Sequence, residues 1–268
     1  MKITNWDNHW REKKDDPLQG VNNPQNWSDF QWLHTLLIID FEVSRSIESE
    51  KSISMLECGS GTAAVSRFFN KKYNLKNVIL DNSIEALKIG ENFIKNDNLE
   101  ISSVLSDIKN MPFDDDSFDI VYLGGVMEYL QDYDSCILEI KRVLKPGGLL
   151  LFVVVPNVIN IQIFGNFFLF FKNVFKNQPT KLVPSNVKKW YADKYINKLL
   201  ENGYASTREY YLNPFPQIPL PRFLKKIYLN LINKSEPLIK KYNLEKYPFK
   251  KFFSVSFIIK ANKSNYNL

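Results

Sequence analysis

Two glycines stand close together between an apolar run and an amphipathic run, in a chain with only 10 glycines among 268 residues. The segment reads Glu57-Cys58-Gly59-Ser60-Gly61, and the apolar run "ISML" precedes it. Glycines at such a point let the backbone turn tightly and approach a bound molecule closely. The free N–H groups of a following helix would face the same space. The pattern indicates a nucleotide-like ligand, although an ordinary strand-to-helix turn also uses glycines.

An acidic residue with the appropriate spacing strengthens this interpretation. Asp81 ends the next apolar run, "NVIL", and lies 20 positions after Gly61. A carboxylate there can accept hydrogen bonds from both hydroxyls of a ribose. The alternative is a helix-capping role, because Asn82 and Ser83 are also capping residue types. We expect Asp81 to hold a sugar.

Other catalytic patterns are not evident in the sequence. There is no zinc-ligand set, no Ser–His–Asp order and no P-loop lysine motif, so we expect no metal. Cys58 and Cys136 have neither metal-site nor disulfide spacing, which favours a reducing compartment, and we interpret Cys58 as a packing residue. The histidines are His9 and His34. Either could act as a general base if the N-terminal segment folds over a cleft, but His34 lies in an apolar helical pattern that favours a structural role.

Short apolar runs alternate with helical patterns from about residue 50 to residue 156. The helical patterns cover residues 62–73, 84–95 and 134–144, and the apolar runs between them are "ISML", "NVIL", "ISSVL", "FDIVYL" and "LLLFVVV". This alternation is typical of βαβ units and of a parallel sheet covered on both faces. The turn Lys145-Pro146-Gly147-Gly148 should lead into the fifth strand.

The flanking segments complete this core. Residues 1–50 should form a helical cover, in which Ser28 or Asp29 is the N-cap of a helix. We expect its apolar stripe to contain Phe30, Leu33, Leu37 and Phe41. A helix and a strand near 191–212 and a last strand near 252–261 complete the α/β domain of residues 51–268. Residues 157–189 and 213–250 look like cap insertions.

Four stretches in this order carry a family resemblance. They are "LECGSGTA", "VILDNS", "SDIKNMPFDDDSFDIVYLGGVMEYLQD" and "LKPGGLLLFVVVPN". With these stretches the chain resembles the class I S-adenosylmethionine-dependent methyltransferases, in particular the small-molecule and lipid-quinone type. The resemblance implies a Rossmann-like, doubly wound and mostly parallel seven-stranded sheet with an antiparallel last strand and a helical cap.

The resemblance also implies a cofactor and the residues that bind it. S-adenosyl-L-methionine would deliver a methyl group by in-line displacement, with the protein supplying orientation and a dry cleft. Asp81 would bind the ribose, and Asp107 would accept a hydrogen bond from the adenine amino group while Ile108 packs on the ring. Glu57 would orient the glycine turn or the methionine amino group. The cofactor-binding set is completed by Gly59, Ser60, Gly61, Asn82 and Gly124, the last facing the methionine portion.

Besides Asp81, three of these residues have structural alternatives, and two positions depart from the family pattern. Asp107 could be a solvated loop acid, Glu57 could cap backbone N–H groups, and Gly124 could serve a tight turn. The third glycine position is Ala63. Tyr129 stands where a histidine is frequent, so the sequence identifies no catalytic base.

Charge and hydropathy limit the partners. The net charge of +6 permits an anionic partner without requiring one. "LGGVMEY" lacks the Asn/Asp-Pro-Pro-aromatic signature of base-amino methyltransferases, and there is no added RNA-binding module, so we expect no nucleic acid. We expect no signal peptide, because the opening residues "MKITNWDNHWREKKDD" are charged and lack an apolar run. Residues 146–171 are uncharged, but part of them is a core strand and the rest is too short to span a bilayer.

The sequence therefore predicts a cytoplasmic methyltransferase with a small-molecule or lipid-linked acceptor. The phenylalanine-rich and lysine-rich insertions could form a substrate lid packed on the core, or could contact an anionic membrane on its inner face. A non-catalytic cofactor-binding regulator or scaffold is the alternative function. A nicotinamide-dependent reductase is disfavoured because its full glycine spacing and a Tyr-x-x-x-Lys are lacking. The acceptor atom and the oligomeric state remain open.

Overall fold

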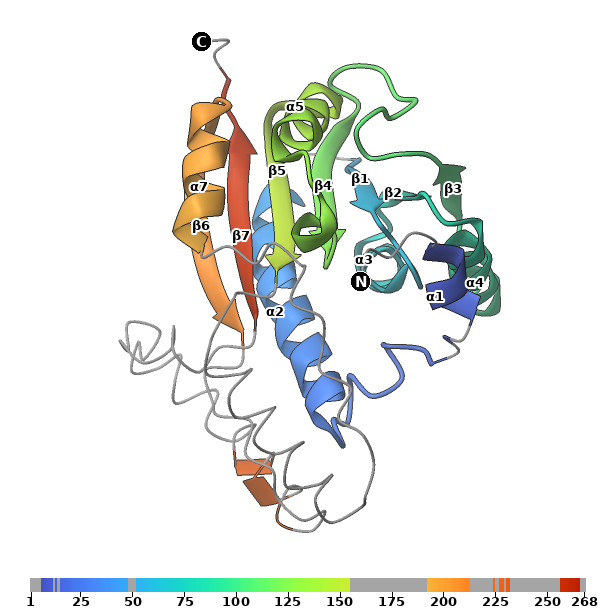
Figure 1. Ribbon diagram of the computed structural model, residues 1–268. Helices are drawn as coiled ribbons and strands as arrows, with labels where there is room; N and C mark the ends of the chain where they lie inside the picture. Colours follow the sequence, from blue (N-terminus) through green and yellow to red (C-terminus); the bar gives the residue numbers. More distant parts are fainter. Residues whose placement is uncertain are drawn as a thin grey trace, which may run out of the picture.

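The computed structural model describes residues 6–11, 13, 15–47, 52–154, 192–212, 224, 227, 228, 230, 231 and 256–265. Its elements alternate along the central part of the chain (Figure 1). The helices are α1 (Trp6–Arg11), α2 (Trp27–Ile47), α3 (Ala64–Tyr73), α4 (Ile84–Asn96), the 3₁₀ turn η1 (Met127–Tyr129), α5 (Tyr133–Val143) and α7 (Ala192–Glu201). The strands are β1 (Ser54–Cys58), β2 (Lys76–Asp81), β3 (Ile101–Leu105), β4 (Phe118–Gly124), β5 (Leu144–Val154), β6 (Tyr204–Leu212) and β7 (Ser256–Lys263).

The strands form one seven-stranded sheet in the order β3-β2-β1-β4-β5-β7-β6. The strands from β3 to β5 are parallel to their neighbours, and β7 pairs antiparallel with both β5 and β6. The order reverses at β1, where β2 lies on one side and β4 on the other. In open α/β sheets, ligands bind outside the carboxyl ends of the strands at such a reversal. The predicted fold class is confirmed.

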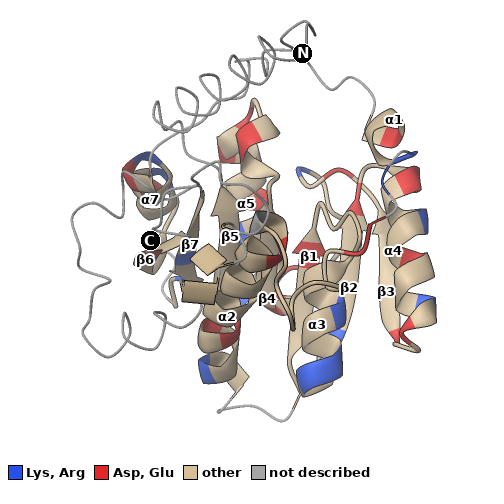
Figure 2. Cartoon of the chain, turned by 90° about the horizontal axis from the view of Figure 1, so that it is seen from below, with Lys and Arg blue, Asp and Glu red and all other residues tan. Residues whose placement is uncertain are grey.

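Helices cover both faces of the sheet (Figure 2). On one face, β1 and β4 contribute Leu56 and Val121 to a core with α5 and α7. On the other face, Met55 and Ile120 pack with α2 and α3, and Ile79 of β2 packs with α4. Because the central strands are buried on both sides, they read as nearly continuous apolar runs rather than as alternating ones.

Local sequence signals set the starts of α4 and α5, which lie on opposite faces of the sheet. The Ser83 side chain accepts a hydrogen bond from the Ala86 amide and caps α4, and Asp132 accepts one from the Ser135 amide and caps α5. Both are N-cap residue types whose oxygen satisfies an amide left free in the first turn. The Ser83 cap places the start of α4 directly after the carboxyl end of β2.

The predicted start and apolar stripe of α2 were partly wrong. The helix begins one residue before Ser28, and Asn26 is the residue whose side-chain oxygen accepts from the amides of Ser28 and Asp29. Phe30 is buried as expected, but Leu37 is 38% exposed and Phe41 is 49% exposed. The residues that face the sheet are Leu36, Ile39 and Val43. In a helix that is apolar on most of its surface, sequence periodicity does not determine which stripe is buried.

The predicted turn Lys145–Gly148 lies inside β5. The pairing of β4 with β5 is irregular there, because Phe118 pairs with Leu144 whereas Ile120 pairs with Leu149. Gly147 has a φ of 75°. The chain therefore bulges out of the ladder at the expected residues and then continues as the same strand. The predicted insertion at 157–189, and 213–250 apart from five residues, lie outside the described residues.

Candidate functional site

The glycine turn follows β1 and folds back over the end of β2. The amides of Gly59 and Ser60 donate to the Leu80 carbonyl at 2.7 and 3.2 Å. Gly59 and Gly61 have φ values of 63° and 52°, in the left-handed region that glycine adopts without strain. This turn links the ends of the first two strands and leads into α3.

Asp81 ends β2 directly beside this turn. Its side chain is 5% exposed, its Oδ2 accepts from the Gly61 amide at 3.0 Å, and its Oδ1 accepts from the Ser83 amide at 3.0 Å. Burial raises the pKa of Asp81, and the hydrogen bonds from Gly61 and Ser83 oppose that rise. The carboxylate therefore holds the turn before α4, whereas the N-cap predicted as its alternative role belongs to Ser83. It lies at the position expected for a ribose-binding acid. Asn82 is exposed next to it.

Glu57 lies beneath the turn and is 4% exposed. Its Oε2 accepts from the Ser66 amide at 2.7 Å, in the first turn of α3. Burial raises the pKa of Glu57 to about 7, although its bonds with Ser66 act in the opposite direction. The contact present is the structural alternative, a carboxylate that binds a backbone N–H at the start of α3, and the predicted roles toward the glycine turn and the methionine amino group stay predictions.

Ser60 is the residue of the turn whose side chain fits a ligand contact. It is 6% exposed, and its Oγ has no hydrogen-bond partner among the described residues. A buried hydroxyl without a partner costs free energy, and such groups concentrate where a ligand or water completes the bonding. The glycine backbone, Ser60 and Asp81 together fit the sugar and amino-acid portions of S-adenosylmethionine.

The adenine-binding prediction receives less support from the geometry. Asp107 is exposed after β3, where its Oδ1 accepts from the Lys109 amide at 2.9 Å and its Oδ2 lies 3.6 Å from Lys109 Nζ. Ile108 is 7% exposed and packs in the core. The loop is nevertheless adjacent to β2, since the Ser106 amide donates to the Asp81 carbonyl at 3.1 Å. Both residues remain predictions.

The end of β4 contributes a residue that the sequence interpretation missed. Gly124 is exposed there, and a Cβ on it would lie 2.7 Å from Tyr122 Oη. Glu128 follows in η1 and is only 4% exposed, with its Oε1 4.0 Å from a Cβ built on Gly125. A buried acid just after a strand end and two glycines is a recognisable signal for a functional residue.

The second missed contribution comes from α1. It lies beside α4 in both views (Figures 1 and 2). Asp7 Oδ1 accepts from Ser83 Oγ at 2.6 Å, and the indole of Trp10 lies against Gly61. Trp6 contacts Tyr129 edge to face, with ring centroids 5.1 Å apart. The signal for this contact is the density of aromatic residues in "WDNHW".

The histidines and Cys58 lie either near the carboxyl ends of the strands or in packed parts of the protein. His9 is exposed on α1 between Trp6 and Trp10, whereas His34 packs on Phe30 in α2. Cys58 is buried, and burial raises the pKa of its thiol. Within the described part of the chain, no three His, Cys, Asp or Glu side chains are grouped as a metal site. The described helices include none long and apolar enough to cross a membrane.

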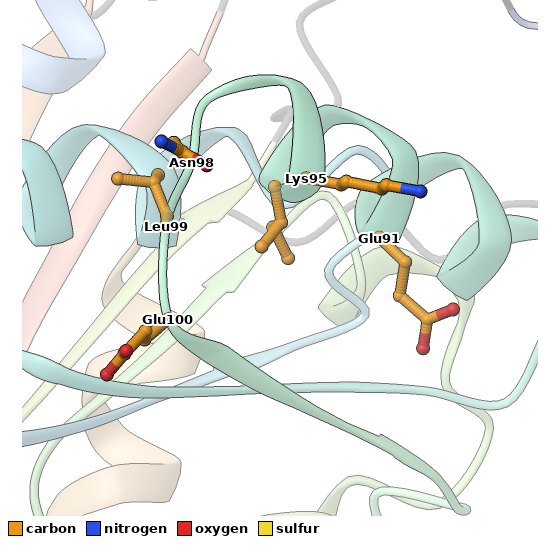
Figure 3. Close-up of a pocket in the computed structure, with 6 residues that line it drawn as sticks. Glu91, Lys95, Asn98, Leu99 and Glu100 are labelled. Atoms are coloured by element: carbon orange, nitrogen blue, oxygen red, sulfur yellow. The ribbon is translucent and has the colours of Figure 1, made fainter.

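A surface cavity of about 530 Å³ lies at the other end of the sheet (Figure 3). Its lining comes from the end of α4 and the residues before β3, namely Glu91, Ile94, Lys95, Asn98, Leu99 and Glu100. Parallel strands place their ligand sites at the carboxyl ends. This cavity is at the amino end of β3, so the glycine turn remains the candidate site.

Comparison with protein families supports this assignment. Residues 56–152 match the family model of a methyltransferase domain. An uncharacterised protein of Methanocaldococcus jannaschii is 31% identical over 148 residues, which cover 53% of this chain and 61% of that protein. Demethylmenaquinone methyltransferase of Staphylococcus carnosus is 35% identical over 109 residues, covering 40% of this chain and 45% of that protein. The matches thus span less than two thirds of these relatives.

Solved structures share the fold at low sequence identity. Phosphoethanolamine N-methyltransferase 2 of Haemonchus contortus, in complex with S-adenosyl-L-methionine, matches with a TM-score of 0.57 and 15% identity over 95% of this chain and 61% of that chain. The [4+2]-cyclase SpnF matches with a TM-score of 0.56 and 16% identity over 85% of this chain and 80% of that chain. The second example indicates that the fold alone does not determine the reaction.

Proposed function

We propose that this chain, whose residues 56–152 match a methyltransferase domain, is a class I S-adenosylmethionine-dependent methyltransferase and that it transfers a methyl group to a small-molecule or lipid-linked acceptor. The observation that carries the proposal is the contact between Asp81 and Gly61 at the reversal of strand order. It fixes a buried carboxylate next to a glycine turn, which is the arrangement that a nucleoside with a charged tail requires.

The residues present fit S-adenosylmethionine in the following way. Asp81 would accept from the ribose hydroxyls, Ser60 Oγ and the turn amides would bind the amino-acid portion, and Asp107 would lie near the adenine. The cofactor supplies an electrophilic methyl group when bound. Orientation of the acceptor and exclusion of water by this chain can provide much of the rate, so a dedicated base is not required.

A lipid-linked acceptor agrees with several relatives and with one exposed surface. Demethylmenaquinone methyltransferases are among the relatives. Leu224, Ile227 and Leu231 are helical and 39%, 54% and 61% exposed. The surrounding sequence "RFLKKIYLNLINKSEPLIKKY" carries six basic residues and one acidic residue. Exposed apolar residues at helical spacing within a basic segment favour contact with an anionic membrane surface.

Two measurements test the reaction. Calorimetry should detect binding of both S-adenosylmethionine and S-adenosylhomocysteine to the full chain. Release of S-adenosylhomocysteine should then rise on addition of a panel of acceptors that includes quinone precursors and aminoalcohol phosphates. Cofactor binding without turnover on any acceptor would favour the regulator or scaffold, and lack of binding would refute both.

The membrane contact has its own test. The full chain should sediment with acidic liposomes, and added salt should release it. Ile227→Glu should reduce sedimentation, while Leu138→Glu is the matched control because Leu138 is 52% exposed on α5. Equal, salt-insensitive sedimentation of both variants, or none by the wild type, would exclude this surface.

A further inference from the structure

The short helix α1 bridges three parts of the candidate site. Asp7 reaches the start of α4, where its Oδ1 accepts from Ser83 Oγ at 2.6 Å and from the Glu85 amide at 3.3 Å. Trp6 reaches Tyr129 in η1, after β4. The helix therefore extends from the end of β2 to the segment that follows β4, across the point where the strand order reverses.

Trp10 covers the glycine turn itself. Its Cη2 and Cζ2 atoms lie 2.4 and 2.7 Å from the position that a Cβ on Gly61 would occupy. The ring is thus in direct contact with the backbone that a cofactor has to approach. A molecule that reaches Gly61 from this side must first displace the indole.

Few contacts hold α1 against the rest of the protein, so the helix can detach at low cost. The helix has six residues, and none of them is buried. An isolated helix of this length is unstable in water, so its position depends on the Asp7, Trp10 and Trp6 contacts. The hydrogen bonds from Ser83 and Glu85 lower the pKa of Asp7, which indicates that the bound form of its carboxylate is the charged one.

We propose that α1 is a lid over the cofactor site, and that it must move away for the cofactor to enter or leave. The closed position is held by the hydrogen bond between Asp7 and Ser83 and by the contact of Trp10 with Gly61. The inference depends on the proposed function for the identity of the ligand. It adds two residues, Asp7 and Trp10, whose effect is on exchange rather than on the methyl transfer itself.

Stopped-flow tryptophan fluorescence with S-adenosylhomocysteine tests the lid in the full chain. Asp7→Asn and Trp10→Ala should each raise the association rate by about fivefold, because each removes one contact that holds the closed state. Two controls should match the wild type. Asp15→Asn makes the same chemical change at an exposed residue of the same segment, and Trp10→Phe keeps an aromatic ring on Gly61.

Tryptic cleavage after Arg11 provides a readout that needs no cofactor. It should be faster in Asp7→Asn than in Asp15→Asn, because an open helix exposes its backbone to protease. Unchanged or lower association rates in Asp7→Asn and Trp10→Ala, with binding intact, would overturn the lid alone. If no variant binds S-adenosylhomocysteine, the proposed function fails, and equal cleavage rates would then overturn the lid as well.

Discussion

The Gly61 amide donates to Asp81 Oδ2 at 3.0 Å, so the residue that should hold a ribose also holds the glycine turn in place. The other oxygen of the same carboxylate accepts from the Ser83 amide, also at 3.0 Å. The predicted alternative, that Asp81 caps α4, is wrong because Ser83 is the N-cap. The two backbone bonds of Asp81 are compatible with its predicted role as a sugar ligand. A carboxylate has about four acceptor positions, and the two backbone bonds leave room for two hydroxyl donors.

Asp81→Asn should weaken binding of S-adenosylmethionine by about tenfold or more, because an amide offers one acceptor oxygen where the carboxylate offers two. It should also lower the unfolding temperature slightly, since one of the amides of Gly61 and Ser83 loses its acceptor. Isothermal calorimetry and thermal unfolding measure the two effects on the same samples.

Asp119→Asn is the matched control for this variant. Asp119 is a partly buried acid near the start of β4, bonded to Ser54 and to Lys145 Nζ at 2.7 Å. The control should lose stability without losing cofactor affinity. If the two variants have the same affinity, Asp81 is not in the binding site.

Glu57→Gln should remove a pH dependence of stability. The folded-state pKa of Glu57 is about 7 and its reference pKa is 4.5, so folding takes up a proton between these values. The wild type should therefore lose stability as pH rises through this window, by about 3 kcal/mol at most. Relative to the wild type, the variant should gain stability from pH 5 to pH 8 in urea unfolding.

If Glu57→Gln instead lost stability relative to the wild type from pH 5 to pH 8, the folded-state pKa of Glu57 would be lowered rather than raised. That result would contradict the assignment of Glu57 as an acid whose burial favours the protonated form. Should the stability difference stay constant between pH 5 and pH 8, the folded-state pKa is close to the reference value. The carboxylate would then be better solvated than its 4% exposure suggests.

The sheet and the glycine turn could be predicted because they depend on local pattern. Apolar runs buried on both faces identify parallel strands, and Gly59 and Gly61 identify the turn between β1 and α3. The same signals place Asp81 beside the turn, because parallel strands end at one edge of the sheet. Asp107 was implied by the family resemblance, and its exposed position next to Lys109 shows how little such a resemblance determines about side-chain direction.

The contribution of α1 could not be predicted in this way. A six-residue helix has too little periodicity to indicate which face is apolar. Its docking depends on Trp10 and Asp7 meeting Gly61 and Ser83, which are about 50 and 76 residues further along the chain. Such long-range contacts leave no local pattern, and the aromatic content of the segment was the sole indication.

The orientation of α2 gives a direct test of the corrected helix face. Ile39→Ala should destabilise the fold by about 2–4 kcal/mol, because Ile39 is fully buried against the sheet. Leu37→Ala should cost less than about 1 kcal/mol, since Leu37 is 38% exposed. Urea unfolding of the two variants compares their stabilities, and a larger loss for Leu37→Ala would restore the stripe expected from sequence.

Arg67→Ala should be among the more destabilising substitutions outside the apolar core. The guanidinium group is 2% exposed, bonds to both oxygens of Asp16 at 3.0 and 2.8 Å, and bonds to Asp97 at 2.7 Å. It also lies 4.8 Å from the ring centroid of Phe93. Its removal leaves two partly buried carboxylates without their shared cation, which should cost about 2–3 kcal/mol after allowance for their solvent exposure.

Lys71→Ala provides the comparison, because Lys71 Nζ lies 2.7 Å from the same Asp97 but its side chain is 47% exposed. An exposed ion pair of this kind contributes about 0–1 kcal/mol, and less in high salt. Urea unfolding in low and high salt should therefore show a large and nearly salt-independent loss for Arg67→Ala and a small, salt-sensitive loss for Lys71→Ala. Equal losses of stability in the two variants would mean that burial of Arg67 does not strengthen its ion pairs. The ion pair between Arg67 and Asp16 would then not stabilise the contact of Asp16 with α3.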